Sequence, residues 1–177
     1  MATVDDLLFH FRRQVALPWR ADTPPEYRVW ILHYDKALDR RVQARLPEFE
    51  DAARRAGHGW AVMGLAPLVA PWLASHELFE GLVNQPDELP SILPEFEEHV
   101  VAQVRARLDQ VGQNDLLVLT GAGAMFGLLR VSRIVQDVAG SIRGRLLVLF
   151  PGYHKEGGYR LLDARDGWSY RAIPIPA

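Results

Sequence analysis

The sequence predicts an α/β fold in which a mostly parallel sheet is flanked by helices and followed by a C-terminal antiparallel hairpin. Three runs of nearly continuous apolar residues carry this prediction: Arg28–Tyr34, Leu116–Leu119 and Leu146–Phe150. Strands that are covered by helices on both faces need apolar side chains at almost every position. Segments with helical periodicity separate these runs, and alternating strands and helices are typical of an α/β sandwich.

The first helix is predicted over Val4–Leu17. Its apolar residues recur at helical spacing and form one face, made of Val4, Leu7, Leu8, Phe11 and Val15. Thr3 is the expected N-cap, and Asp5 and Asp6 follow it in the first turn, where the helix dipole favours negative charge. Pro18 ends the helix because proline cannot continue it.

The segment after the first strand, Lys36–Ala56, is also predicted to be helical. Asp35 is its expected N-cap, and Pro47 is expected to restart a second helix at the N1 position, which suits proline. Gly57 stops this helix, and Trp60–Met63 then forms a fourth candidate strand.

Two more helices are predicted in the second half of the chain. The apolar stripe of Pro94–Val111 indicates a long helix, and Ser132–Val138 indicates a short one whose first residue is the expected cap. Near the C-terminus, Tyr159–Leu162 and Trp168–Ile173 flank the turn sequence Asp163–Gly167. This pattern predicts the hairpin that closes the sheet.

Composition places the chain among ordinary globular proteins. The 177 residues are 49% hydrophobic and 24% charged, which suits one α/β domain over residues 1–177. The chain has no cysteine, which excludes disulfides, thiolate metal sites and cysteine nucleophiles. No segment reaches the roughly 18 apolar residues that span a bilayer, and no signal peptide is recognised. We therefore expect a cytoplasmic protein that does not associate with a membrane.

Charge is distributed unevenly along the chain. Residues 128–177 carry eight basic and four acidic side chains, whereas residues 56–104 carry no lysine or arginine. The acids of that second segment form a candidate partner-binding face: Glu77, Glu80, Asp87, Glu88, Glu95, Glu97 and Glu98. Such asymmetry suits steering toward a charged partner. The alternative is a solvated acidic surface with no partner.

The sequence carries no recognisable active site. Gly121–Gly127 follows a strand, but Leu128–Arg130 stands where a nucleotide-binding P-loop needs Lys-Ser or Lys-Thr. A dinucleotide site is disfavoured because the next strand ends in Phe150-Pro151-Gly152, without an acid for the ribose. Metal-ligand spacings and serine-nucleophile motifs are absent as well. We expect no catalytic residues, no metal and no cofactor, and we interpret the glycines as a tight strand-to-helix turn.

A ligand cleft is nevertheless expected at one edge of the sheet. Ligands of parallel α/β sheets bind beyond the carboxyl ends of the strands. The residues that the sequence places there are Asp35, Thr120, Gly121, Gly123, Tyr153, His154 and Lys155. The alternative is that the loop that begins at Tyr153 is an ordinary surface loop.

Several segments together resemble the BrxB family of bacteriophage exclusion (BREX) systems. They follow one another in order from near residue 4 to about residue 170 and cover nearly the whole chain: Leu17–Trp19, Trp30–Lys36, Ala56–Trp60, Leu119–Ala122, Arg143–Gly152 and Tyr159–Trp168.

The resemblance implies a role in defence against phage. BrxB proteins are small core components encoded beside a PglZ-type alkaline-phosphatase-like protein, a DNA methyltransferase and a large ATPase, and the family supplies no catalytic residues. For this chain, the resemblance implies a non-enzymatic adaptor that docks onto the PglZ-type protein and contacts other BREX subunits. DNA would be bound only indirectly or weakly. The alternative is a small-ligand or nucleotide-binding protein that uses the strand-end cleft.

Overall fold

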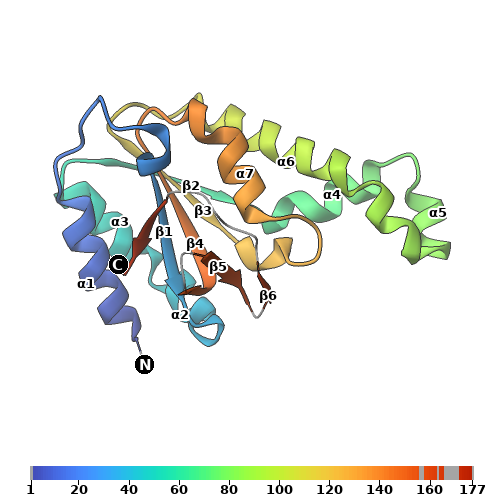
Figure 1. Ribbon diagram of the computed structural model, residues 1–177, viewed down its shortest axis with the longest axis horizontal. Helices are drawn as coiled ribbons and strands as arrows, with labels where there is room; N and C mark the ends of the chain where they lie inside the picture. Colours follow the sequence, from blue (N-terminus) through green and yellow to red (C-terminus); the bar gives the residue numbers. More distant parts are fainter. Residues whose placement is uncertain (1, 156–157, 163, 166–171, 177) are drawn as a thin grey trace.

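The protein is built around a parallel sheet whose strand order is β2-β3-β4-β1-β7 (Figure 1). The computed structural model describes residues 2–155, 158–162, 164–165 and 172–176. Every neighbouring pair along this order is parallel. The strands are β1 (Val29–Tyr34), β2 (Gly59–Gly64), β3 (Asp115–Thr120), β4 (Arg145–Lys155) and β7 (Ile173–Ile175). The α/β class and the four predicted strands are confirmed.

Helices cover both faces of this sheet. Because β4 alternates its side chains between the faces, Leu147 and Leu149 join one core while Leu146 and Val148 join the other. The first core is completed by α1 (Val4–Val15), α2 (Asp39–Ala44) and α3 (Leu46–Arg55), and the second by α6 (Leu93–Leu108) and α7 (Val131–Val138). Continuous burial along β3 and β4 explains their unbroken apolar runs.

The C-terminal strands differ from the predicted hairpin. An antiparallel hairpin joins β4 to β5 (Gly158–Leu161), and β6 (Ala164–Arg165) pairs with β5. The expected partner, Trp168–Ile173, lies outside the described residues except for positions 172 and 173. Ile173 begins β7, which runs parallel to β1. A hairpin between Tyr159–Leu162 and Trp168–Ile173 is therefore not clearly shown.

Two of the three predicted N-caps, Thr3 and Asp35, accept the expected backbone hydrogen bond. Thr3 caps α1 in a reciprocal capping box with Asp6, and Asp35 accepts a 2.8 Å hydrogen bond from the backbone of Ala37. That bond begins a 3-10 turn, η2 (Lys36–Leu38), instead of an α-helix. The cap predicted at Ser132 is wrong. Helix α7 begins one residue earlier with Arg130 at its N-cap, and Ser132 is buried inside the first turn.

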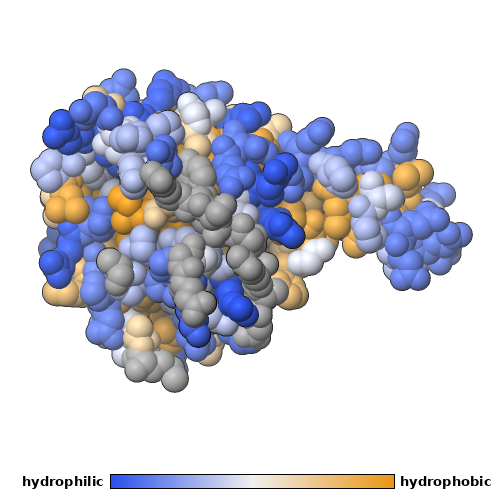
Figure 2. Space-filling model, in the orientation of Figure 1, coloured by the Kyte–Doolittle hydropathy of each residue, from blue (hydrophilic) through white to orange (hydrophobic). Residues whose placement is uncertain are grey.

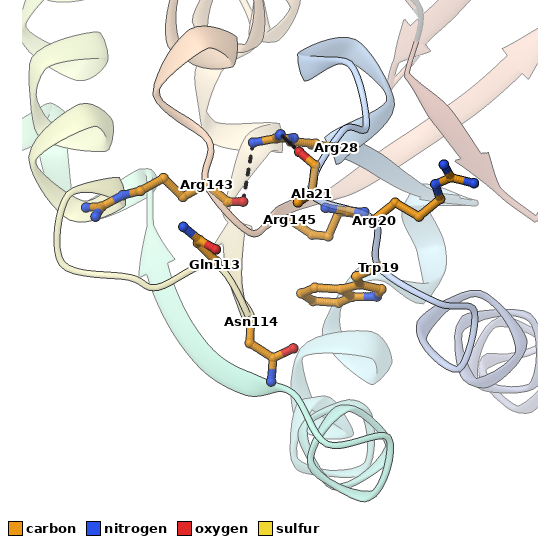
Figure 3. A pocket seen from close by; sticks show the side chains of 8 residues that line it. All are labelled: Trp19, Arg20, Ala21, Arg28, Gln113, Asn114, Arg143 and Arg145. Atoms are coloured by element: carbon orange, nitrogen blue, oxygen red, sulfur yellow. Dashed lines mark hydrogen bonds between the residues drawn. The ribbon is translucent and has the colours of Figure 1, made fainter.

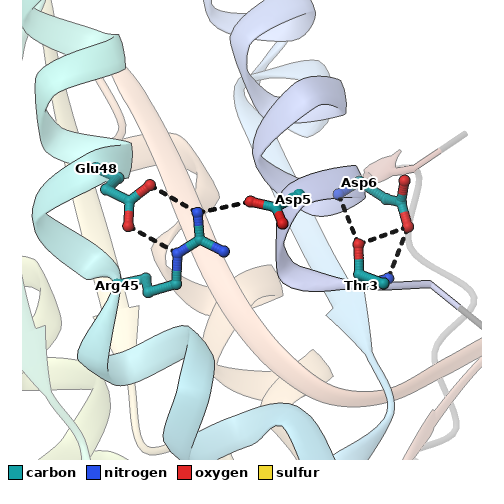
Figure 4. A network of polar contacts seen from close by, with 5 residues as sticks. All are labelled: Thr3, Asp5, Asp6, Arg45 and Glu48. Carbon is teal, nitrogen blue, oxygen red and sulfur yellow. Dashed lines mark hydrogen bonds and ion pairs between the residues drawn. The ribbon is translucent and has the colours of Figure 1, made fainter.

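A polar network joins α1 to α3 on the outside of the sheet (Figure 4). The Arg45 guanidinium donates 2.7 Å bonds to both oxygens of Glu48, and its Nη2 also lies 2.7 Å from Asp5. Hydrogen bonding to Arg45 lowers the pKa of Glu48. The pKa of Asp6 is lowered by its hydrogen bonds to the backbone and then the side chain of Thr3.

The region between β2 and α6 forms a helical extension that the sequence did not predict. It contains η3 (Ala66–Leu68), α4 (Val69–Ser75), α5 (Phe79–Asn84) and η4 (Pro86–Ser91). Together with the first turns of α6 it reaches beyond the end of the sheet (Figure 1). We call residues 66–98 the acidic arm.

The acidic arm is anchored by aromatic packing at its base. The Trp72 ring lies 5.0 Å from the ring of Phe96 and 5.0 Å from that of His76, measured between centroids. Leu82 and Ile92 are the buried aliphatic residues farther along it. The arm is therefore packed at its base and buries two aliphatic side chains farther along.

Candidate functional site

The acidic arm carries every residue of the predicted acidic face. Glu97 is half-buried, and the other six side chains are exposed: Glu77, Glu80, Asp87, Glu88, Glu95 and Glu98. They come from α5, η4 and the first turns of α6, with Glu77 just before α5. Acids scattered over 22 positions of sequence are thus gathered on one projecting element.

Only two of these acids lie within ion-pair distance of a basic side chain among the described residues. Glu95 lies 3.2 Å from Nε2 of His76, and Glu97 lies 3.5 Å from Nε of Arg133. The arm itself contains no lysine or arginine. The remaining carboxylates, which have no ion pair within the described part of the chain, are Glu77, Glu80, Asp87, Glu88 and Glu98.

Large apolar side chains are exposed beside these acids. Leu78, Phe79 and Val83 are 49%, 40% and 63% exposed. Figure 2 shows hydrophobic surface on the projecting part of the molecule next to hydrophilic residues. A surface that combines apolar contact area with uncompensated negative charge is suited to a protein partner with a basic, partly apolar face. It repels nucleic-acid phosphates.

A cavity lies at the predicted strand ends, but only two of the seven predicted residues line it. A cavity of about 250 Å³ lies at the carboxyl ends of β1 and β4 and contains Asp35 and Tyr153 from the predicted set. The other predicted members do not line it: Thr120, Gly121, Gly123, His154 and Lys155. The other residues that line the cavity are Ala2, His33, Tyr34, Lys36, Gly152, Leu162 and Pro176.

Several polar groups of this cleft are already engaged by the protein. The Tyr34 hydroxyl donates a 2.8 Å bond to Asp39, and Nε2 of His33 lies 3.0 Å from the carbonyl oxygen of Pro176. Burial raises the pKa of Tyr34 far above its usual range, and the neighbouring Asp39 adds to the shift. The hydroxyl therefore stays protonated and acts as a donor.

The glycine-rich turn after β3 is a packing feature. Gly121 adopts φ +75°, and a Cβ there would lie 3.1 Å from the backbone nitrogen of Ala66. The turn continues into η5 (Ala122–Met125), a 3-10 helix of four residues. This agrees with the interpretation of the glycines as a tight turn, although a 3-10 helix follows in place of an α-helix.

A second cavity lies at the amino ends of the strands, where the sequence predicted no site (Figure 3). It has a volume of about 320 Å³ and is lined by Trp19, Arg20, Ala21, Arg28, Gln113, Asn114, Arg143 and Arg145. Ligands of parallel sheets are expected at the carboxyl ends of the strands, so the sequence predicted no site at the amino ends. The available signal was the Arg-Gly-Arg sequence at 143–145, where the buried strand β4 begins.

Two further features concern metals and membranes. The described residues contain no group of three or more histidine, aspartate or glutamate side chains arranged to hold a metal ion. Among the same residues, no helix combines the length and the apolar character that crossing a bilayer requires.

Comparison with known proteins identifies the family. The family model for BREX protein BrxB matches residues 76–175, more than half of the 177-residue chain. The match begins within the acidic arm and ends in β7. No curated protein and no solved structure matches the chain. The chain belongs to the BrxB family and is a BREX defence-system protein.

Proposed function

We propose that this protein is a non-enzymatic adaptor subunit of a BREX complex and that it docks through the acidic arm onto a PglZ-type phosphatase-like partner. The observation that carries the proposal is the arm itself. It carries exposed apolar side chains together with carboxylates that form no ion pair with the described residues, on an element that projects from the sheet.

The composition of the arm fits an interface better than a solvated surface. Interfaces combine an apolar centre with a charged rim, and complementary charge steers the encounter of the two proteins. Leu78, Phe79 and Val83 supply the apolar centre, and the acids around them supply the rim. A solvated helix of the same charge has no need of three exposed large apolar residues.

The non-enzymatic part of the proposal rests on the sequence and the resemblance. The chain lacks cysteine, a serine-nucleophile motif and a phosphate-binding loop. The resemblance to BrxB implies no catalytic residues. An adaptor needs none of these groups, because its contribution is to hold other subunits together.

Co-purification with the PglZ-type protein of the same operon tests the adaptor role. The two proteins are co-expressed with a tag on one, purified at low and moderate salt, and analysed by size-exclusion chromatography with light scattering. We expect a complex of defined stoichiometry. Separate elution of the two proteins at every salt concentration would contradict docking.

A small-ligand function at the strand-end cleft is the second candidate. The observation in its favour is the cavity of about 250 Å³ that contains Asp35 and Tyr153. Thermal unfolding with a panel of nucleotides tests it, since a ligand at 100 times its dissociation constant adds about 2.7 kcal/mol of stability. A shift that Tyr153→Ala and Asp35→Ala both remove would favour this function. No shift for any nucleotide would count against it.

A further inference from the structure

We propose that the cavity at the amino ends of β1, β3 and β4 is an anion site that binds a phosphate group through Arg28 and Arg145 (Figure 3). Arg28 directly precedes β1, Asn114 directly precedes β3, and Arg145 is the first residue of β4. The strand order β3-β4-β1 therefore places these residues side by side. None of the residues that line the cavity belongs to the acidic arm.

Arg145 is a buried cation without an acidic partner. It is 6% exposed, and its guanidinium donates to the Gly144 carbonyl at 2.9 Å and to the Thr23 hydroxyl at 3.3 Å. Its Cζ lies 5.0 Å from the centroid of the Trp19 ring. None of these partners carries a negative charge, and no carboxylate lies within ion-pair distance in the described part of the chain. Burying a charge in this state is costly, so a compensating anion would stabilise it.

Arg28 places a second positive charge at the same cavity. Its Nε donates to the Thr23 carbonyl at 2.8 Å, and its Nη atoms donate to the carbonyls of Ala21 at 2.8 Å, Ile142 at 2.7 Å and Arg143 at 3.3 Å. These bonds fix the guanidinium without neutralising it. The pKa of Arg145 is lowered mainly by burial and further by the positive charge of Arg28. The protein therefore holds two like charges against their mutual repulsion.

The other two arginines of the cavity serve different purposes. Arg20 forms a 3.0 Å ion pair with Asp22, and its side chain extends away from Arg145. The Arg143 side chain extends away on the other side, where Nη2 donates to the Asp109 carbonyl at 2.7 Å. The positive charge inside the cavity thus comes from Arg28 and Arg145.

The remaining walls indicate the size and class of the anion. The planar donor fork of arginine matches the geometry of phosphate oxygens. The Gln113 amide faces the same cavity and has no hydrogen-bond partner among the described residues. Trp19 is not available to stack a nucleobase, because His58 lies on its ring at 3.5 Å between centroids and Arg145 lies over it. The cavity therefore recognises the phosphate group itself, whether as free phosphate or as the phosphate of a nucleotide.

Thermal unfolding of the purified protein tests this site. The additives are inorganic phosphate, adenosine 5′-monophosphate and adenosine, each compared with sodium chloride at equal ionic strength. We expect both phosphate compounds to raise Tm and adenosine to leave it unchanged. A larger shift with the nucleotide at equal concentration would identify a nucleotide phosphate as the source, and equal shifts would identify the phosphate group alone. Shifts no larger than those with sodium chloride would overturn the proposal.

Gln113→Glu is the decisive variant because this side chain is exposed, lines the cavity and forms no hydrogen bond with the described residues. Its carboxylate would occupy the cavity as an internal anion, so we expect the phosphate affinity to fall at least ~10-fold and the phosphate-free Tm to rise. Gln103→Glu, on an exposed position of α6 outside the cavity, is the control with the same charge change. Equal phosphate responses of the two variants would overturn the assignment.

Arg145→Met provides a second, independent variant. It keeps an unbranched stem over Trp19 and removes the buried charge. We expect its phosphate response to disappear. A retained response would overturn the assignment of Arg145, and if this variant fails to fold, Gln113→Glu still decides the proposal.

Discussion

The Nε2 atom of His33 donates a 3.0 Å hydrogen bond to the carbonyl oxygen of Pro176 and so links β1 to the residue that follows β7. A carbonyl oxygen only accepts, so this nitrogen carries the proton. Burial lowers the pKa of His33, the bond to Pro176 opposes that shift, and nearby His154 adds to the lowering. The neutral imidazole is therefore the form that the folded protein prefers.

The first prediction concerns acid stability. The pKa of His33 is lower in the folded state than its unfolded value of about 6.5, so the unfolded state binds more protons as the pH falls through that value. The contribution of His33 is complete above about pH 6.5 and is lost below it. In His33→Gln, whose amide still donates to Pro176, we expect a smaller fall in the free energy of unfolding between about pH 7.5 and pH 5. Urea unfolding at both pH values measures this, and equal falls would refute it.

The second prediction separates the base of the acidic arm from its tip. Phe96 is 2% exposed and packs on Trp72, so Phe96→Ala should cost about 3–5 kcal/mol of unfolding free energy. Phe79 is 40% exposed, so Phe79→Ala should change the stability by only about 0.5 kcal/mol. Urea denaturation compares the same substitution at both sites, and similar losses would show that the tip is packed.

The third prediction concerns the turn after β3. Gly121 and Gly127 both have positive φ, +75° and +78°, but only Gly121 is close to another segment, at Ala66. An alanine at either position costs about 1–2 kcal/mol for the left-handed conformation. Gly121→Ala should lower Tm further than Gly127→Ala, because its methyl group would press on the backbone of Ala66. Thermal unfolding of the two variants gives the comparison, and a larger effect at Gly127 would contradict it.

The fourth prediction concerns the apolar centre of the proposed interface. Val83 is 63% exposed, so Val83→Ser should leave the unfolding free energy within about 0.5 kcal/mol of the wild type. If Val83 is buried by the PglZ-type partner, the same change should weaken the complex. Calorimetric titration measures the affinity, with Val62→Ser as the control because Val62 is also exposed, at 39%, and lies on β2 outside the arm. Equal affinities of the two variants would exclude Val83 from the interface.

The sequence predicted the centre of the sheet well because β1, β3 and β4 are buried along most of their length. Leu116–Leu119 and Leu146–Phe150 are fully buried, so their patterns admit few other structures. The edge strand β7 is only three residues long and contains Pro174, and it has no pattern of its own that predicts pairing with β1. Its position depends on contacts with residues about 140 positions earlier in the chain.

The two candidate sites were predicted only in part, again because local sequence patterns do not reveal contacts between distant segments. The absence of basic residues between 56 and 104 is visible in sequence, but the helices α4 and α5 are only seven and six residues long, with Pro71 inside α4 and Pro86 shortly after the end of α5. Their shape follows from tertiary packing. The cavity around Arg145 depends on four segments meeting at one edge, and no local spacing encodes that meeting.

The affinity of an arm variant for the PglZ-type protein tests the central claim most directly. The variant Glu80→Lys with Glu88→Lys reverses the charge of two exposed arm acids that have no ion pair among the described residues. Glu95 and Glu97 are left unchanged because they contact His76 and Arg133. Asp109→Lys with Asp137→Lys, at exposed positions outside the arm, gives the same charge change as a control. We predict that the arm variant binds at least ~10-fold more weakly than the control, with the difference shrinking at high salt. Equal affinities of the two variants would contradict docking through the acidic arm.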